Sequence, residues 1–247
     1  MRAVLATSGG LPGAAVLERL RAAPAIEIVG VVRSTRILSA RYGRLRGAWA
    51  QLRRSGLRYG AYLACATFPR MDAQGLPLLE TRDLNDAGAR AFLARLAPQL
   101  LVSAFFNQRI GAEVVALAGA GAVNIHPSLL PEYRGVDPVF YARLRAAARL
   151  GVTVHRVAPE LDRGAILAQA PLALRPEESV LAATVRLYAH GAGLLAQNLE
   201  RIAAGDPGAP QAAEGGYDSW PTAAQVAALR ARGVRLAAWR DLRLRGA

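Results

Sequence analysis

The chain contains one cysteine and no lysine among its 247 residues. A single thiol, Cys65, cannot form an internal disulfide, and it excludes a metal site built from several cysteines. We interpret Cys65 as a small buried apolar side chain. Without lysine the chain has neither a P-loop, whose lysine contacts nucleotide phosphates, nor a Schiff-base nucleophile. The sequence shows no spacing of metal ligands, so we expect no bound metal.

All 31 basic residues are therefore arginines, and with 18 acidic residues they give a net charge of +13. Guanidinium groups bind carboxylates and phosphates through two parallel hydrogen bonds, so this composition suits an anionic partner. A base composition of the gene that favours arginine codons is an equally good explanation. The charge alone does not separate the two.

Long apolar runs are also missing. No stretch of about 18 apolar residues lacks charges, so we predict no transmembrane helix. The opening residues, Met1–Ala6, lead into Thr7-Ser8 and then glycines, which is typical of a first strand and not of a signal peptide. We expect a cytoplasmic protein. At 53% hydrophobic residues, the chain can bury one substantial core.

Apolar strand-like runs alternate with helical patterns over the first two thirds of the chain. This alternation predicts an α/β fold: a Rossmann-like open, largely parallel sheet with helices on both faces and a short C-terminal extension. We predict one domain over residues 1–205, with a basic aromatic insertion at about 38–70, and an extension over 206–247. The strand candidates are Ala3–Thr7, Ile26–Val32, Leu100–Ala104, Ala122–Ile125 and Val152–Val157, and the helix candidates are Ala14–Arg21, Asn85–Leu96, Pro138–Arg149 and Glu177–Ala204.

The insertion does not fit the alternating pattern. Residues Arg41–Phe68 mix arginines with tryptophan, tyrosines and leucines. One interpretation is an interfacial helix on an anionic membrane, or a lid over a lipid-like or anionic substrate. The other is an ordinary amphipathic hairpin that packs on the sheet edge. The first would make the protein membrane-peripheral.

Asn124 and His126 stand at the end of the apolar run Gly121–Val123. If that run is a strand, both side chains point to the same side of the sheet. An amide donor beside a titratable ring can stabilise a carbonyl oxygen as it becomes an oxyanion. A histidine in an apolar strand is by itself more often structural, so the pair needs support from elsewhere in the chain.

Four stretches supply that support, because together they resemble the 10-formyltetrahydrofolate-dependent formyltransferases. This family includes glycinamide ribonucleotide, methionyl-tRNA and sugar N-formyltransferases. Asn124–Gly135 is similar to the family's N-x-H-x-S-L-L-P-x-Y-x-G loop, and Glu160–Gln169 is similar to L-D-x-G-x-I-x-x-Q. Gly151–Val157 resembles the strand between them, and Phe105–Ile110 stands at the folate-contacting segment. The resemblance runs from about residue 1 to 204 and is densest between 100 and 170.

The resemblance implies that Asn124, His126 and Asp162 are catalytic. Asn124 would donate to the oxyanion, His126 would donate a second hydrogen bond and move a proton, and Asp162 would act as the base. Asp162 lies 38 residues after Asn124 (162 − 124). An Asp two residues before a glycine is by itself more often turn chemistry.

The resemblance also implies a folate site, with 10-formyltetrahydrofolate as the co-substrate and no metal. We expect its contacts at Phe106, Asn107, Gln108, Arg109, Ile110, Glu160 and Leu161.

For the acceptor the candidates are Ser8, Gly9, Gly10, Ser128, Tyr133, Arg134, Asp137 and His155. Each has a structural alternative. The Ser8–Gly10 turn can present N–H groups to a phosphate, or its glycines can be only steric. Tyr133 and Arg134 can bind the acceptor or pack their loop. Asp137 can contact the acceptor or cap the helix that Pro138 opens. His155 can line the cleft or be a partly buried strand residue.

Our leading hypothesis is an N-formyltransferase whose acceptor is a small amine, such as an amino sugar. The arginine-rich composition would suit an acceptor that carries an anionic group. The alternatives are a formyltetrahydrofolate hydrolase, a glycinamide ribonucleotide formyltransferase and, last, a non-enzymatic scaffold on the same fold. The Ser8–Gly10 turn is shorter than the G-x-G-S-N loop of the glycinamide ribonucleotide enzymes, which counts against that substrate. Only 42 residues (247 − 205) follow Gly205, so we expect no tRNA-binding module and no nucleic-acid partner. The sequence does not determine whether the protein is a monomer or an oligomer.

Overall fold

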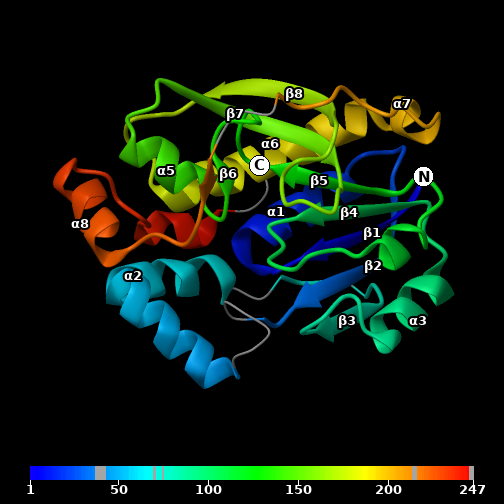
Figure 1. The fold of residues 1–247 in the computed structure, drawn as a ribbon, viewed down its shortest axis with the longest axis horizontal. Helices are drawn as coiled ribbons and strands as arrows, with labels where there is room; N and C mark the ends of the chain where they lie inside the picture. The colour runs from blue at the N-terminus through cyan, green and yellow to red at the C-terminus, as the bar shows by residue number, and fades with distance from the viewer. Residues whose placement is uncertain (37–42, 69–70, 74, 213–215, 245–247) are drawn as a thin grey trace.

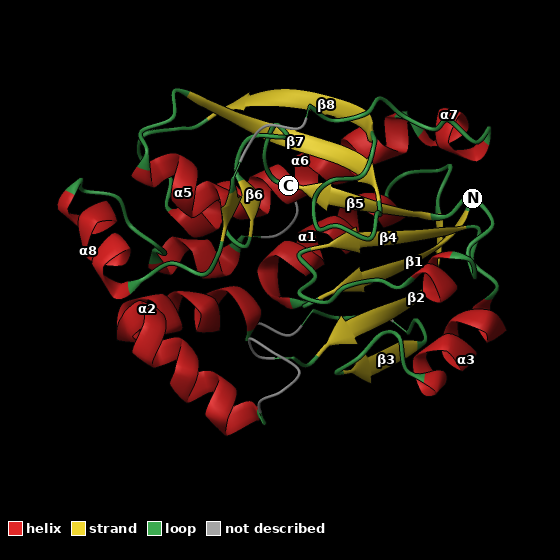
Figure 2. Ribbon diagram, viewed as in Figure 1, coloured by secondary structure: helices red, strands yellow, loops and turns green. Residues whose placement is uncertain are grey.

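A seven-stranded sheet forms the centre of the molecule in a computed structural model that describes residues 1–36, 43–68, 71–73, 75–212 and 216–244 (Figures 1 and 2). The strand order is β3-β2-β1-β4-β5-β7-β8. Pairing is parallel from β3 to β5, whereas β7 runs antiparallel to both β5 and β8. The predicted α/β class and the largely parallel sheet are confirmed. The strands are β1 Arg2–Thr7, β2 Glu27–Ser34, β3 Leu78–Thr81, β4 Leu100–Ala104, β5 Ala122–His126, β7 Arg149–Arg156 and β8 Ile166–Ala173, and a second small sheet pairs β6 Arg134–Gly135 with β9 Tyr217–Asp218.

Helices cover both faces of the sheet (Figure 1). The long α6 and the N-terminal α1 pack together against one face, where their apolar side chains join those of the central strands in one core cluster. α3 covers the other face with Phe92 and Leu93. The helices are α1 Gly10–Arg21, α2 Arg44–Thr67, α3 Ala87–Leu96, α4 Ala112–Val115, α5 Pro138–Leu144, α6 Val180–Gln197, α7 Leu199–Ala203, α8 Ala223–Ala231 and the 3-10 helix η1 Trp239–Arg243.

Three predicted helices are shorter than expected, and the first of them, α3, begins at Ala87 instead of Asn85. α5 ends at Leu144 instead of Arg149, because Ala146 has a left-handed φ of 54° and β7 begins at Arg149. The predicted Glu177–Ala204 helix begins three residues later and is divided at Asn198, which caps α6 and opens α7.

The described part of the insertion is one helix, α2, bent at Gly56, whose φ of 79° and ψ of 166° are not helical. Figure 1 shows its two halves meeting at a sharp bend, and α2 packs against α1 and α8. Residues 37–42 and 69–70 of the expected insertion lie outside the described residues. Cys65 in this helix is half-buried, not fully buried as expected. No helix in the described ranges is long and apolar enough to cross a bilayer.

Residues of the C-terminal extension pack against the rest of the molecule. α8 contacts α2, and its Val226 and Leu229 are buried in the same apolar cluster as Tyr59 and Tyr62. β9 pairs with β6, which follows the Asn124–His126 strand by a short loop. The extension therefore reaches the edge of the sheet at which the candidate catalytic residues stand.

Candidate active site

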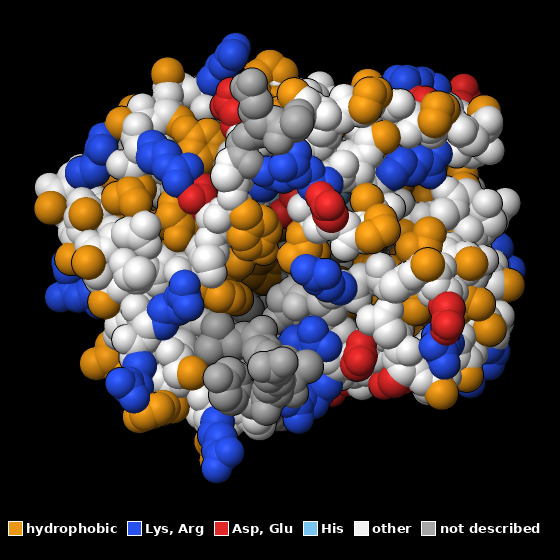
Figure 3. Space-filling model, in the orientation of Figure 1, with side chains coloured by type: hydrophobic (Ala, Val, Ile, Leu, Met, Phe, Trp, Pro, Cys, Tyr) orange, Lys and Arg blue, Asp and Glu red, His pale blue; other side chains and the backbone are white. Residues whose placement is uncertain are grey.

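A cavity of about 560 Å³ opens at the carboxyl ends of the parallel strands β1, β4 and β5. Open α/β sheets bind ligands at this edge. Figure 3 shows the hollow near the middle of the viewed face. Strand ends supply one side of its lining, while α2, α6 and the extension supply the other. The lining includes Ser8, Phe105, Asn124, His126, Asp137 and Asp162 together with Tyr59, Tyr62, Leu63, Thr67, Thr184, Tyr188, Tyr217 and Trp220.

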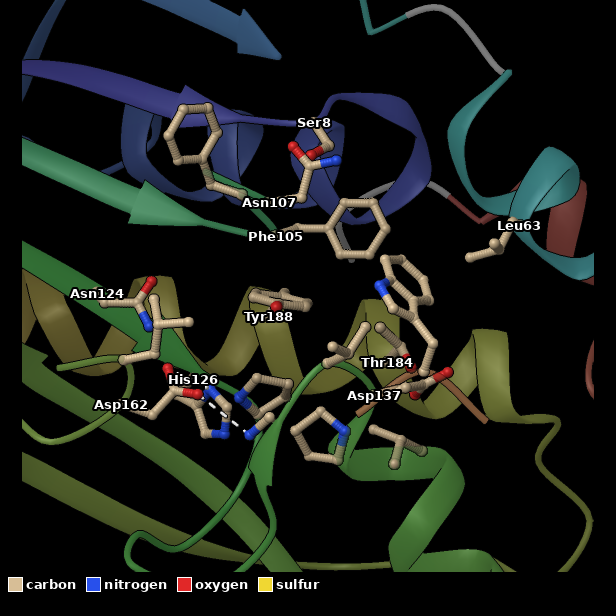
Figure 4. Close-up of a pocket in the computed structure, with 18 of the residues that line it drawn as sticks. Ser8, Leu63, Phe105, Asn107, Asn124, His126, Asp137, Asp162, Thr184 and Tyr188 are labelled. Carbon is tan, nitrogen blue, oxygen red and sulfur yellow. Dashed lines mark hydrogen bonds and ion pairs between the residues drawn. The ribbon is translucent and has the colours of Figure 1, made fainter. Parts of the chain in front are cut away.

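The structure brings Asn124, His126 and Asp162 together at one end of this cavity (Figure 4). Asn124 and His126 come from β5, as their spacing requires. Asp162 has a left-handed φ of 56°, a conformation that Asp tolerates better than most residues. Its Oδ1 lies 3.5 Å from His126 Nδ1, and its Oδ2 accepts a hydrogen bond from Gly135 N–H at 3.1 Å. The carboxylate is thus fixed between the histidine and the loop that follows β5.

Both ring nitrogens of His126 face acceptors. Nε2 lies 3.2 Å from the carbonyl oxygen of Tyr133, and Nδ1 faces the Asp162 carboxylate. Both ring nitrogens are therefore held by contacts within the protein. Donation from His126 to an oxyanion, as expected from the sequence, requires one of these two contacts to be given up.

His155 orients the Asn124 amide. His155 Nδ1 lies 2.8 Å from the carbonyl of Arg156, which places its proton on Nδ1 and leaves Nε2 as an acceptor. Asn124 Nδ2 donates to that Nε2 at 3.0 Å, which commits one amide hydrogen, and the other has no partner among the described residues. Burial lowers the pKa of His155 to about 4, and the nearby His126 acts in the same direction. His155 is therefore neutral at neutral pH. It belongs to the site, but it lies behind Asn124 and not in the larger cavity.

A second, smaller pocket of about 70 Å³ lies on the other side of Asn124 and Asp162. Its walls are the segment after β4 and the loop before β8, and Phe106, Ile110, Val157 and Leu161 are among its apolar lining. Polar side chains, among them Gln108, Arg109 and Glu160, complete the lining of this narrow slot. Six of the seven expected folate residues line it: Phe106, Gln108, Arg109, Ile110, Glu160 and Leu161.

The amides of Asn107 and Gln108 are occupied by the protein itself. Asn107 accepts from the Ser34 hydroxyl at 2.6 Å and donates to a backbone carbonyl. Gln108 accepts from Leu84 N–H at 2.7 Å and donates to Ser34 and Thr81. These contacts tie the loop after β4 to β2 and β3. Asn107 lines the larger cavity and not the slot.

The expected acceptor residues separate into two groups. Ser8 and Asp137 line the larger cavity. Gly9 is the N-cap of α1, and a Cβ on Gly10 would lie 1.9 Å from the Ala66 carbonyl oxygen, so this pair permits close packing against α2. Gly9 and Gly10 do not line the cavity.

Three further acceptor candidates, Ser128, Tyr133 and Arg134, belong to the loop after β5 and make contacts within it. The Ser128 hydroxyl is buried and donates to the Glu132 carbonyl at 2.7 Å. Tyr133 has a left-handed φ of 53° and offers its carbonyl to His126, while its ring lies under Arg145. The Arg134 side chain is buried. These contacts favour the loop-packing alternative for Ser128, Tyr133 and Arg134.

Asp137 lies at the other end of the cavity from Asp162 (Figure 4). Its carboxylate caps α5 through Phe140 N–H at 3.2 Å and accepts from the Tyr59 hydroxyl at 2.9 Å. Burial raises the pKa of Asp137 to about 6, although these hydrogen bonds act in the opposite direction. The residue therefore caps the helix and also lines the cavity, and its contact with the acceptor stays a prediction.

The aromatic wall of the cavity was missed in the sequence. Tyr59 and Tyr62 come from the second half of α2, and their ring centroids lie 5.2 Å apart. Trp220 meets Tyr59 edge-on at 6.5 Å, and Phe105 meets Tyr188 in the same way at 5.8 Å. The spacing of Tyr59 and Tyr62 at i and i+3 signals one helix face, but which face reaches a cavity depends on long-range packing.

The chain belongs to the formyl transferase family, whose signature matches residues 54–199. A methionyl-tRNA formyltransferase from Roseiflexus sp. (strain RS-1) is 36% identical over 199 residues, which is 79% of this chain and 56% of that protein. The chain spans about half the length of the curated relatives it matches.

Two solved structures share the fold at lower identity. A phosphoribosylglycinamide formyltransferase from Anaplasma phagocytophilum has a TM-score of 0.59 at 21% identity, covering 89% of this chain and 98% of that one. The formyltransferase PseJ from Anoxybacillus kamchatkensis, in complex with a formamido nucleotide sugar and tetrahydrofolate, has a TM-score of 0.50 at 18% identity, covering 89% and 86%. These two structures show the fold, whereas the family signature and the 36% identical relative confirm the family expected from the sequence.

Proposed function

We propose that the protein transfers a formyl group from 10-formyltetrahydrofolate to a primary amine. The observation that carries the proposal is the contact between His126 and Asp162 beside Asn124, at the boundary between the large cavity and the narrow slot. The folate ring would occupy the slot and the acceptor the cavity, so that the two reactants meet at these three side chains.

The bound folate would supply an activated formyl group, and the protein would supply the polar groups around it. The uncommitted amide hydrogen of Asn124 donates to the formyl oxygen as negative charge develops there. As the amine nitrogen bonds to the formyl carbon, Asp162 accepts the proton that this nitrogen loses, directly or through a water. Asp162 then returns a proton to the folate nitrogen when its bond to the formyl carbon breaks. The His126 ring faces the Asp162 carboxylate at 3.5 Å and holds it beside Asn124.

We further propose a small acceptor, with an amino sugar as the leading class. Aromatic side chains offer apolar faces for a ring to stack on, and Asp137 can accept from a hydroxyl at the end remote from Asp162. Within the described lining, the cationic side chains are Arg36 and Arg109. A phosphate would bind at their side of the cavity and not beside Asp137.

Methionyl-tRNA is the second candidate acceptor. The names of the curated relatives favour it. A methionine thioether also makes favourable contacts with aromatic rings, which this cavity provides through Tyr59, Tyr62 and Trp220. This candidate runs against the expectation of no nucleic-acid partner, which rested on the short segment after Gly205.

The test is tetrahydrofolate release from 10-formyltetrahydrofolate, with and without nucleotide-linked amino sugars, glycinamide ribonucleotide or charged initiator tRNA. Release that requires an amine supports the proposal and identifies the acceptor, whereas release in buffer alone would assign a hydrolase. Asn124→Ala is expected to lower the rate about 10²–10³-fold. Glu113→Gln, an exposed carboxyl outside both pockets, is the matched control and should leave the rate unchanged. An Asn124→Ala protein with the wild-type rate would end this mechanism.

A further inference from the structure

The first half of α2 presents its large apolar side chains to solvent. Leu45, Trp49 and Leu52 follow one another at i, i+4 and i+7 and therefore share one helix face. They are 87%, 61% and 38% exposed. An amphipathic helix that served only the protein's own core would turn this face inward. Figure 3 shows arginine and hydrophobic side chains side by side over the region of α2, at the lower left of the view.

The opposite face of the same half-helix is small and polar, and it is the face that packs on the protein. Gly47, Gln51 and Ser55 are buried at i, i+4 and i+8. Gln51 donates to the Ser55 hydroxyl at 2.9 Å, and Ser55 donates to the carbonyl of Pro221. These polar contacts fix which face points outward. The exposure of Leu45, Trp49 and Leu52 is therefore built into the packing of the helix.

The charged residues of the segment that contains this face have one sign. The 44 residues between Glu27 and Asp72 (72 − 27 − 1) contain nine arginines and no acidic residue. The Arg53 guanidinium lies 4.7 Å from the centre of the Trp49 ring, at the border of the apolar face. Arginines that flank an apolar stripe can keep their charged ends at the level of lipid phosphates while the stripe enters the bilayer.

We infer that the Leu45–Trp49–Leu52 face is a docking surface for an anionic lipid bilayer. Apolar residues with flanking arginines and no acidic residue match an interfacial helix that lies in the plane of a negatively charged membrane. A second copy of the chain is a poor occupant, because it would bring two acid-free arginine-rich faces together.

Docking through α2 has a consequence for the cavity. Tyr59, Tyr62 and Leu63, in the second half of the same helix, form part of the cavity wall. A bilayer that holds the first half thus lies next to the helix that lines the acceptor cavity. The docking surface itself does not depend on the proposed formyl transfer, and it can be tested with protein and lipid alone.

The experiment is co-sedimentation of the full chain with phosphatidylcholine vesicles, with and without phosphatidylglycerol. We expect binding only with the anionic lipid, and weaker binding at about 0.5 M salt than at low salt, because salt screens the arginines. Trp49→Ala combined with Leu52→Ser should weaken binding at least about tenfold while leaving the circular dichroism spectrum unchanged. Leu78→Ser, on edge strand β3 and similarly exposed at 41%, is the matched control and should bind as the wild type does.

Tryptophan emission gives a second readout. Vesicles should shift the emission to shorter wavelength, and Trp49→Phe should keep the binding but lose most of that shift. Three results would overturn the inference: no sedimentation with anionic vesicles at low salt, equal losses in the Leu78→Ser control, or undiminished binding by the Trp49→Ala/Leu52→Ser protein. Binding to polyglutamate as tight as binding to anionic vesicles, with the same loss in the double variant, would assign the face to an acidic protein partner instead.

Discussion

Replacement of Asp137 by asparagine tests whether the cavity carries a buried charge. The carboxylate is 7% exposed, and burial raises its pKa from an ordinary value of 3.8 to about 6. Between these two values the folded state holds a proton that the unfolded state has released. This carboxyl therefore makes the protein more stable as the pH falls from about 6 toward 3.8, and it destabilises the folded state above that window.

The size of the effect follows from the two pKa values. Linkage gives a gain of about 1.3 kcal/mol in the unfolding free energy of the wild type between pH 7 and pH 5 from Asp137 alone. Asparagine has no such titration, and it still caps α5. The buried His155, whose pKa is lowered, acts in the opposite direction as the pH falls, but it is present in both proteins. The difference between variant and wild type isolates Asp137.

Urea unfolding followed by circular dichroism at pH 7 and pH 5 measures this difference. The variant should lose about 1.3 kcal/mol relative to the wild type on going to pH 5. Asp86→Asn makes the same change at the N-cap of α3, where the side chain is exposed and accepts from Ala89 N–H at 2.7 Å. This control measures what the same substitution does at an exposed helix cap. A difference for Asp137→Asn that stays constant within about 0.5 kcal/mol across the two pH values would refute the burial argument.

Three further outcomes are expected. Tyr59→Phe removes the hydroxyl donor to Asp137 and should cost about 1.5–3 kcal/mol in urea unfolding at pH 7, where the carboxyl is charged. Gly164→Ala places a Cβ 1.6 Å from a carbonyl oxygen of β7, so its melting temperature should fall, and an unchanged value would contradict the packing. His155→Phe keeps an aromatic ring but removes the acceptor that orients Asn124, and kcat should fall about tenfold or more. His155→Gln, which retains an acceptor, should recover part of that loss.

The sequence predicts the interior strands of the fold and misses its edges. All five residues of β4 are buried, and such a strand is written as a continuous apolar run. β3 and β8 stand at the two ends of the sheet order, and in both of them exposed residues alternate with less exposed ones. Their identity as strands depends on a neighbour to pair with, and the local pattern does not record it.

The same division holds for the site. Asn124 and His126 are two residues apart on one strand, so a local period predicts that they share a side. Asp162 was expected there through the resemblance of its loop to the family. The aromatic wall comes from segments as far apart as Tyr59 and Trp220, which are brought together only by the packing of α2 against the extension. Sequence reasoning therefore predicts the reacting end of the cavity better than the acceptor end.

Gly135 joins these two ends. Its N–H donates to Asp162, which holds the proposed base against His126. Its φ is 126°, and a Cβ at this position would lie 2.0 Å from the Asp218 carbonyl oxygen, so glycine is required where β6 pairs with β9. The backbone that fixes the carboxylate is thus the backbone that receives the C-terminal extension. Tyr217 and Trp220 of that extension line the cavity. A movement of this part of the acceptor wall would therefore shift Gly135 and, through its hydrogen bond, the Asp162 carboxylate.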